Sequence, residues 1–199
     1  MLMNIDCIYE RRSIRKFSDK SVSKEILEKI LEAGRVAPSA KNRQPWKFIV
    51  FGGEQKEKLL ACMEKGILRE EQQPLLPYST KGIPDCKNTL RIMKEAPIII
   101  IVLNTNGYSP FIEINSDDRI TEICDTLSIG ASIENILLKS TEIGIGTLWI
   151  ANTCFAYPEL VDFLNTQNQL IGAIALGYAN ETPPPRPRKD SADVIEYRL

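Results

Sequence analysis

The chain of 199 residues contains no histidine. This absence excludes Ser/His/Asp and Cys/His catalytic sites, zinc sites that use histidine, and proton transfer through an imidazole ring. If the protein is an enzyme, its chemistry must therefore be carried by a cofactor or by carboxylates and lysines.

Long apolar runs and an excess of charge are also missing. The longest apolar run, residues 96–103, has the length of one strand, whereas about 20 residues are needed to span a membrane. The first residues, 1–12, lack the charged start, apolar stretch and cleavage site of a signal peptide. The net charge is −1, so no global charge attracts nucleic acid or an anionic membrane. These absences predict a cytoplasmic protein with no nucleic-acid partner and no membrane partner.

Cysteines are few and scattered. The five cysteines are an odd number, and none forms a CxxC pair. Free thiols in a reducing compartment are the simplest interpretation, and no metal site is expected.

Hydrophobic residues make up 43% of the chain, which is enough for one compact domain over residues 1–199. Apolar periodicity predicts helices over residues 24–35, 54–65, 118–143 and 158–164, and strands over residues 48–51, 96–104, 145–152 and 169–179. The run at 96–104 does not alternate, which predicts a strand that is buried on both faces.

Two segments lack a regular pattern. Residues 66–90 contain several prolines and few periodic apolar residues, which predicts an irregular, lid-like excursion. The C-terminal tail, residues 180–199, begins with a proline-rich stretch that favours an extended path. Its last residues include Val194, Ile195 and Tyr197, which are too apolar to remain in water. We expect the tail to cross a surface and dock, for example on a partner subunit.

The helix expected at 118–143 is apolar around much of its circumference. Ile120, Ile123 and Leu127 form one stripe, and Ile129 and Ile133 lie off it. This pattern predicts a central helix, with a subunit interface as its second apolar surface.

Basic residues form two clusters, RRSIRK at 11–16 and RPRK at 186–189. If the first cluster is extended, Arg11, Ser13 and Arg15 share one face and Arg12 lies on the other. Two guanidinium groups beside a hydroxyl suit a phosphate, since arginine offers bidentate, charge-assisted donors. The alternative is a solvated surface cluster.

The stretch PSAKNRQPW at 38–46 lies between an expected helix and an expected strand. A simple turn accounts for its prolines and for Trp46. It does not account for Asn42 and Gln44, whose amides can donate and accept hydrogen bonds at the edge of a heterocycle.

Nucleotide-binding signatures are incomplete. Gly144 and Gly146 open a GxG motif, but Trp149 stands where a third glycine is required, and no GxxxxGK[ST] loop occurs. A tight helix-to-strand connection with a glycine cap is the alternative interpretation of the two glycines.

Taken together, these segments resemble the FMN-dependent nitroreductase family. RRSIRKF, PSAKNRQPW, GASIENILL leading into EIGIGTLWI, and PRPRKD occur in the order and spacing of that family, and the match covers most of the chain. The resemblance implies an α+β sandwich, a mostly antiparallel sheet flanked by helices, in a domain-swapped homodimer. FMN would lie at the dimer interface.

The resemblance also implies which residues contact FMN. Phosphate ligands would be Arg11, Arg12, Ser13, Arg186 and Arg188, with the register of the tail leaving Lys189 as an alternative. Arg15 would lie toward the ribityl and pyrimidine end and is the favoured source of positive charge near N1, with Lys41 and Arg43 as alternatives. The isoalloxazine would be contacted by the other subunit's loop, through Pro38, Ser39, Ala40, Asn42 and Gln44, and on its N5 side by the backbone of Gly144, Ile145 and Gly146.

The implied activity agrees with the missing histidine, because the flavin carries the chemistry and no side chain is required as an acid or base. NADH or NADPH would reduce FMN, and a nitroaromatic, a quinone or a similar electron-poor acceptor would then take its place in a ping-pong cycle. Two alternatives stay open: a specialised branch that performs reductive dehalogenation or flavin breakdown, and a non-catalytic flavin-binding protein.

Overall fold

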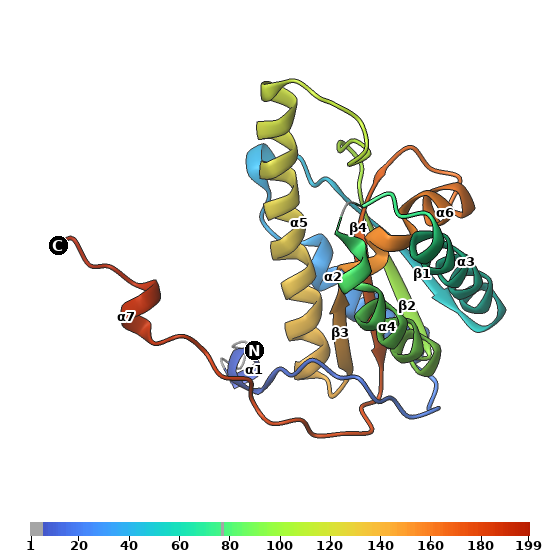
Figure 1. Ribbon diagram of the computed structural model, residues 1–199. Coiled ribbons are helices and arrows are strands. Elements are labelled where there is room, and N and C mark those ends of the chain that lie inside the picture. Colours follow the sequence, from blue (N-terminus) through green and yellow to red (C-terminus); the bar gives the residue numbers. More distant parts are fainter. Residues whose placement is uncertain (1–5, 77) are drawn as a thin grey trace.

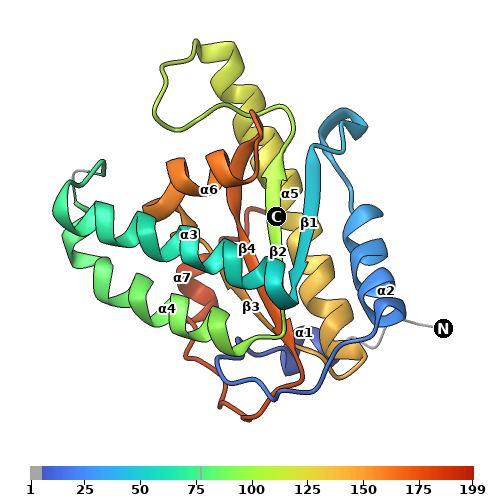
Figure 2. The same cartoon turned by 90° about the vertical axis from the view of Figure 1, so that its right-hand side faces the viewer.

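The computed structural model describes residues 6–76 and 78–199. Its centre is a four-stranded sheet between two layers of helices (Figures 1 and 2). The strands pair in the order β1-β2-β4-β3, and every pair is antiparallel. Their bounds are β1 Trp46–Gly52, β2 Ile98–Asn104, β3 Gly146–Ile150 and β4 Gln169–Gly177. The predicted α+β sandwich with an antiparallel sheet is confirmed.

Helices cover both faces of the sheet (Figure 1). One face packs against α2 (Lys24–Arg35) and α5 (Ser116–Glu142), and the other packs against α3 (Gly53–Gln72), α4 (Ile83–Glu95) and α6 (Tyr157–Phe163). The shorter elements are α1 Asp6–Glu10, η1 Ala40–Asn42, η2 Ser79–Lys81, η3 Asn152–Ala156 and α7 Ser191–Val194. None of the helices in residues 6–76 and 78–199 is long and apolar enough to cross a membrane.

Strand β2 is the centre of both cores. Ile99 and Ile101 pack toward α3, α4 and α6, whereas Ile100 and Val102 pack toward α2 and α5. All four side chains are fully buried, and each contributes roughly 1.5–3 kcal/mol of hydrophobic free energy. The predicted strand with two buried faces is therefore confirmed.

Helices α2 and α5 each begin at a residue whose side chain caps the helix. Ser23 Oγ accepts a hydrogen bond from the amide of Ile26 at 3.4 Å at the start of α2. At the start of α5, the Asn115 side chain accepts one from the amide of Asp118 at 2.9 Å. Such caps satisfy amides that have no partner within the helix, so they fix where each helix starts.

The expectation of an irregular excursion over residues 66–90 is wrong. Helix α3 continues to Gln72, and α4 begins at Ile83. Pro84 does not interrupt α4, because it lies in the first turn, where a missing amide hydrogen costs nothing. The segment is thus a helical hairpin with a short connection, of which residue 77 lies outside the described part.

A buried carboxylate, Glu70, holds the connection between α3 and α4. Its oxygens accept hydrogen bonds from the amides of Leu75 at 3.0 Å and Leu76 at 2.9 Å. Burial raises the pKa of Glu70, but these amides together with the side chains of Ser79 and Arg69 bring it below its ordinary value, which favours the charged carboxylate. Arg69 joins Glu70 to Glu159 on α6, and this pairing lowers the pKa of Glu159. The ion pair between Arg69 and Glu159, which are distant in the sequence, therefore stabilises the helical hairpin, and the sequence pattern does not indicate it.

We expect Gly66→Ala to destabilise the fold, although alanine favours helices by about 1 kcal/mol over glycine. A Cβ at position 66 would lie 2.3 Å from Ala156 Cβ and 2.5 Å from Ala156 Cα. Such overpacking costs about 1–3 kcal/mol. The midpoint of thermal unfolding should therefore fall by several degrees.

Lys58→Ala serves as the control, because Lys58 is exposed on the same helix. It should change stability by no more than about 0.5 kcal/mol. A Gly66→Ala protein as stable as this control would contradict the close approach of α3 to Ala156.

Candidate functional site

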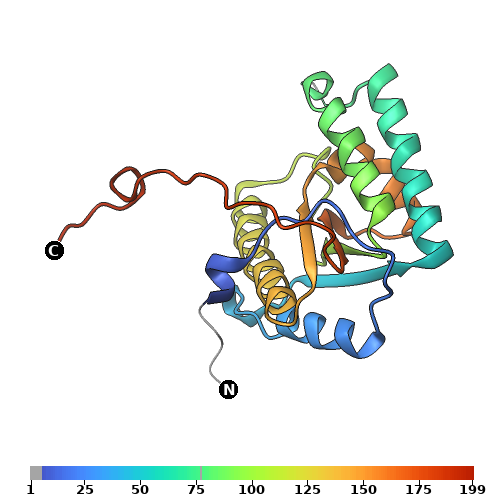
Figure 3. The same ribbon diagram turned by 90° about the horizontal axis from the view of Figure 1, so that it is seen from below.

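The two basic clusters meet at a cavity of about 250 Å³. The cavity lies between the N-terminal segment, residues 8–15, and the start of the tail, residues 183–188. The ribbons of these two segments pass close to each other (Figures 1 and 3). Its lining includes predicted cofactor residues from both ends of the chain: Arg11, Arg12, Ser13, Arg15, Arg186 and Arg188. Lys189 is not among the lining residues of the described chain. The fold thus brings the two clusters together, with Arg186 and Arg188 as the tail's contribution.

The N-terminal segment is fixed to the edge of the sheet. Ser13 forms a bridge with Thr147 on β3, and the amide of Ile14 donates to the Thr147 carbonyl at 2.9 Å. The side chains of Ile14 and Phe17 are buried in the core, so the arginines between and beside them remain at the surface. Burial of the apolar residues therefore determines where the basic side chains point.

Arg12 also lines the cavity, contrary to the prediction that it lies on the opposite face from Arg11. The reason is that the extended segment starts later than the sequence pattern indicated. The amide of Arg11 still makes a helical hydrogen bond to the Cys7 carbonyl at 3.0 Å, at the end of α1. Two-residue alternation therefore applies only from Ser13 onward.

Glu181, which the sequence analysis missed, attaches the tail to the N-terminal segment. One carboxylate oxygen accepts hydrogen bonds from the amides of Arg15 at 2.5 Å and Lys16 at 3.1 Å. A main-chain hydrogen bond also joins the two segments, from the amide of Asn180 to the Lys16 carbonyl at 2.9 Å. A carboxylate that accepts two amides explains how both basic clusters are held at one place, and no local sequence pattern indicates it.

The lining of the cavity is strongly positive. It contains five arginines and, among the described residues, no carboxylate. The arginine donors bond mainly to carbonyl groups of their own segment, as Arg15 does to Ser13 at 3.0 Å and Arg188 does to Arg186 at 3.3 Å. Such contacts are readily exchanged for an anion, because charge-assisted bonds to phosphate oxygens are stronger. The donor set fits a phosphate group.

Arg11 also pairs with an acidic side chain, Glu134 on α5, whose Oε1 lies 3.4 Å from Arg11 Nε. Burial raises the pKa of Glu134, and the charge of Arg11 opposes that shift. The contact orients the Arg11 side chain along the edge of the cavity.

A second cavity of about 200 Å³ adjoins the first, since both are lined by Arg12 and Pro183. Its lining includes Gly144, Ile145 and Gly146, the predicted contacts to the N5 side. Only their backbone is available there, because the side chain of Ile145 is buried in the core.

The structure explains why glycine occupies both position 144 and position 146. Gly144 has φ +77° and follows α5, and its amide donates to the Thr141 carbonyl at 3.1 Å. This is the glycine cap that the alternative interpretation predicted. At Gly146 a Cβ would lie 2.9 Å from Ile14 Cγ1, so glycine lets the N-terminal segment pack against β3.

The loop at residues 38–45 has a strained backbone. Lys41, Asn42 and Gln44 have φ values of 53°, 54° and 49°, in the left-handed region. For residues other than glycine this conformation costs about 1–3 kcal/mol each, and such strain is concentrated at functional sites. A plain connection between a helix and a strand would not require it.

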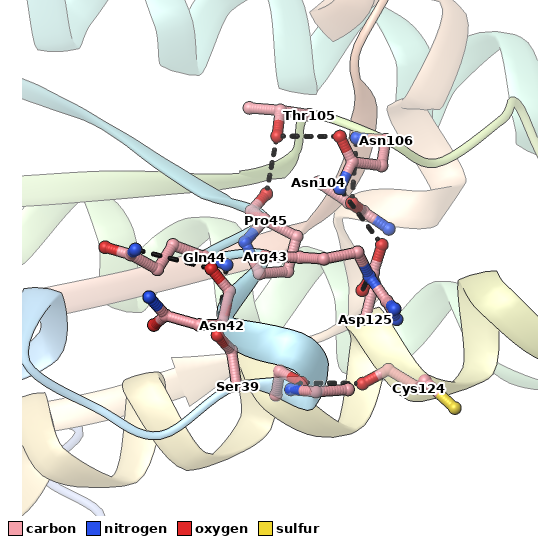
Figure 4. A network of polar contacts seen from close by, with 12 residues as sticks. Ser39, Asn42, Arg43, Gln44, Pro45, Asn104, Thr105, Asn106, Cys124 and Asp125 are labelled. Carbon is pink, nitrogen blue, oxygen red and sulfur yellow. Dashed lines mark hydrogen bonds and ion pairs between the residues drawn. The ribbon is translucent and has the colours of Figure 1, made fainter.

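The loop directs its polar side chains in two directions (Figure 4). Arg43 reaches toward α5, where its Nε donates to Asp125 Oδ1 at 2.7 Å. Asn42 and Gln44 point the other way and are exposed. Arg43 is therefore committed to an ion pair within the protein, whereas the two predicted flavin-contacting amides are available to a ligand.

The structure does not unite this loop with the arginine-lined cavity in one protomer. The loop contacts α5 at Asp125, and the N-terminal segment contacts α5 at Glu134. These positions are about two and a half helical turns apart, which is about 14 Å along the axis and on opposite sides of the helix. The two sets of predicted cofactor residues thus face different sides of α5.

Several apolar side chains of α5 are exposed on the part of the helix that contacts the loop. On α5, Ile120, Ile123 and Leu127 are 61%, 52% and 70% exposed, although Ile129 and Ile133 on the same helix are fully buried. We call these three exposed side chains the α5 stripe. The predicted second apolar surface of this helix is thus present, and residues 6–76 and 78–199 leave it uncovered.

The tail beyond residue 188 extends away from the body of the protomer (Figures 1 and 3). All its residues from 184 to 199 are exposed, including the apolar ones: Val194, Ile195, Tyr197 and Leu199. The predicted docking of this segment does not occur on any part of the chain that the structure describes.

Comparisons with known proteins agree with this architecture. The Nitroreductase family model matches residues 8–178. A protein of Archaeoglobus fulgidus with the provisional name NADH dehydrogenase/NAD(P)H nitroreductase is 29% identical over 87% of this chain and 84% of its own. The nitrobenzene nitroreductase of Ectopseudomonas oleovorans is 28% identical, over 90% of this chain and 88% of its own.

Among solved structures, a nitroreductase with bound FMN from Desulfitobacterium hafniense DCB-2 is similar over the full length of both chains. The TM-score is 0.74 and the sequence identity is 25%. The family match covers the four strands, helices α2 to α6, the basic cluster at 11–16 and the loop at 38–45, but not the tail. The chain belongs to the nitroreductase family.

Proposed function

We propose that the protein is an FMN-dependent oxidoreductase that uses NADH or NADPH to reduce nitroaromatics, quinones or similar electron-poor acceptors. The observation that carries this proposal is the arginine-lined cavity at which segments 8–15 and 183–188 of a nitroreductase-family chain meet. The FMN phosphate would bind there, held by guanidinium groups and by the hydroxyl of Ser13.

The chemistry of the donors supports this assignment. Four arginines of the lining, Arg11, Arg12, Arg186 and Arg188, provide bidentate donors for a group with two negative charges, and Ser13 provides a neutral donor. Arg15 would bind farther along the cofactor and stabilise negative charge near N1. Arg43 cannot serve that purpose while it is paired with Asp125.

We propose further that the complete site is formed by a domain-swapped homodimer. The α5 stripe and the exposed end of the tail would be covered by a second copy of the chain, since such apolar side chains favour burial. The partner's loop at 38–44 would then lie against the isoalloxazine, with its exposed amides toward the heterocycle. This arrangement accounts for two sets of cofactor residues on opposite sides of α5.

When held there, FMN would supply the hydride-transfer chemistry between NAD(P)H and the second substrate, and the two substrates would use the same place in turn. The protein's own residues bind and orient the cofactor and supply positive charge. No side chain has to carry a proton, which suits a chain without histidine.

The test is the visible absorption spectrum of the purified protein incubated with FMN, before and after NADH or NADPH is added without air. We expect a yellow protein that bleaches with a pyridine nucleotide and recovers its colour when a nitroaromatic or quinone is added. Recovery with each acceptor, followed by stopped-flow absorbance, identifies the preferred class.

Two results would contradict the proposal. A protein that binds FMN and never bleaches would be a non-catalytic flavin-binding protein. A protein that remains colourless would show that the arginine-lined cavity does not hold FMN.

A further inference from the structure

Asp125 on α5 is fully buried, and both its carboxylate oxygens bind loops that are distant in the sequence. Oδ1 accepts a hydrogen bond from Arg43 Nε at 2.7 Å, and Oδ2 accepts one from Asn106 Nδ2 at 3.1 Å (Figure 4). A buried carboxylate needs such partners, since it would otherwise be strongly destabilised. Asp125 thus fixes the loop at 38–45 and the loop after β2 to the same turn of α5.

The loop has few other contacts that could maintain its strained conformation. The amide of Ala40 donates to Ser128 Oγ at 3.1 Å, one turn farther along α5, and Ser39 Oγ accepts from the amide of Gln44 at 3.0 Å. At its end, the Pro45 carbonyl accepts from the amide of Thr105 at 2.8 Å. All of these hydrogen bonds are neutral. The ion pair of Arg43 with Asp125 is therefore the strongest single contact that holds the loop, because charge-assisted hydrogen bonds are stronger than neutral ones.

The ion pair lies in the middle of the strained residues. Asn42 and Gln44 flank Arg43, and both have positive φ. Because Arg43 is drawn inward to Asp125, its two neighbours are turned outward (Figure 4). Arg43 Nη2 is buried and has no hydrogen-bond partner among the described residues. This nitrogen therefore makes no contact that could hold Arg43 in place if the bond to Asp125 were lost.

We infer that Asp125 is a positioning residue for the cofactor: through Arg43 it holds the loop in the conformation that presents Asn42 and Gln44 to the flavin. This inference rests on the proposed function. It assigns to α5 a role beyond packing, because the same helix carries the anchor of the loop and the exposed α5 stripe.

The experiment compares full-length wild-type protein with Asp125→Asn, Arg43→Gln and the double variant that carries both. Asp117→Asn is the matched control, because Asp117 is exposed in the first turn of the same helix. Three quantities are measured: the dissociation constant for FMN, the visible circular dichroism of bound FMN, and amide hydrogen exchange of residues 39–44 in the protein without FMN.

We expect Asp125→Asn and Arg43→Gln each to raise the dissociation constant about tenfold or more, as expected for loss of one charge-assisted contact. The double variant should bind FMN no more weakly than the weaker single variant, because both substitutions remove the same contact. Amide exchange should accelerate in residues 39–44, and the circular dichroism of bound FMN should change. Asp117→Asn should leave all three unchanged.

Unchanged FMN affinity and unchanged exchange in a folded Asp125→Asn protein would overturn the inference. If that single variant does not fold because Arg43 loses its partner charge, the double variant decides, since it has no unpaired charge at this position. Wild-type affinity in the double variant would overturn the inference as well. If the wild-type protein itself binds no FMN, the proposed function fails, which is a different outcome from normal binding by the variants.

Discussion

A protein truncated after Thr182 is expected to lose its affinity for FMN while its sheet and both cores remain folded. The deletion removes Arg186 and Arg188 and one wall of the arginine-lined cavity. It removes no buried residue, because every residue from 184 onward is exposed. Loss of two charge-assisted contacts costs about 3 kcal/mol or more, so the dissociation constant should rise at least about 100-fold. Fluorescence titration with FMN measures it.

A second truncation, after Asp190, is the control. It removes the apolar end of the tail and leaves the cavity wall at residues 183–188 intact. We expect this protein to bind FMN much more tightly than the shorter one. Equal affinity of the two truncated proteins would show that the tail arginines do not hold the phosphate.

Leu127→Glu is expected to separate the proposed dimer. Leu127 is 70% exposed in the protomer, so the substitution should leave the protomer folded. In a dimer that covers the α5 stripe, a glutamate would be buried without a partner, which costs several kcal/mol. Analytical ultracentrifugation should show a monomer at micromolar concentration. FMN affinity should fall as well, because the partner's loop would no longer reach the cofactor.

Leu68→Glu is the matched control, because Leu68 is 49% exposed on α3, away from the α5 stripe. It should change neither the mass of the particle in solution nor the affinity for FMN. A Leu127→Glu protein that stays dimeric would exclude the α5 stripe from the interface, and a monomer that retains full FMN affinity would show that one protomer suffices for the site.

The strands and long helices could be predicted because their hydrophobic patterns are strong. The isoleucine run of β2 has only one stable place in a small sheet, which is the middle. The hydrophobic pattern does not predict α4, because polar residues interrupt its buried ones and prolines precede it. Pro84 lies in the first turn of α4, where proline favours the start of a helix, whereas proline in the interior of a helix interrupts it.

The candidate site was predictable only as separate clusters. Local spacing indicated a phosphate site at Arg11 and Ser13, and an unusual loop at 38–46. It could not indicate which basic side chains are free, because that depends on partners that are distant in sequence. Arg43 is paired with Asp125, and Glu181 joins the two ends of the chain. Both carboxylates look like ordinary surface residues in the sequence.

The strand order β1-β2-β4-β3 has a consequence for synthesis on the ribosome. β2 ends at residue 104, but its second neighbour, β4, begins only at residue 169. During translation of the intervening segment, one edge of an isoleucine-rich strand therefore has no partner. Such strands are prone to intermolecular pairing, and nascent chains that expose them depend on chaperones. Premature termination before β4 would leave a polypeptide that aggregates, whereas premature termination after Gly177 would leave every strand paired.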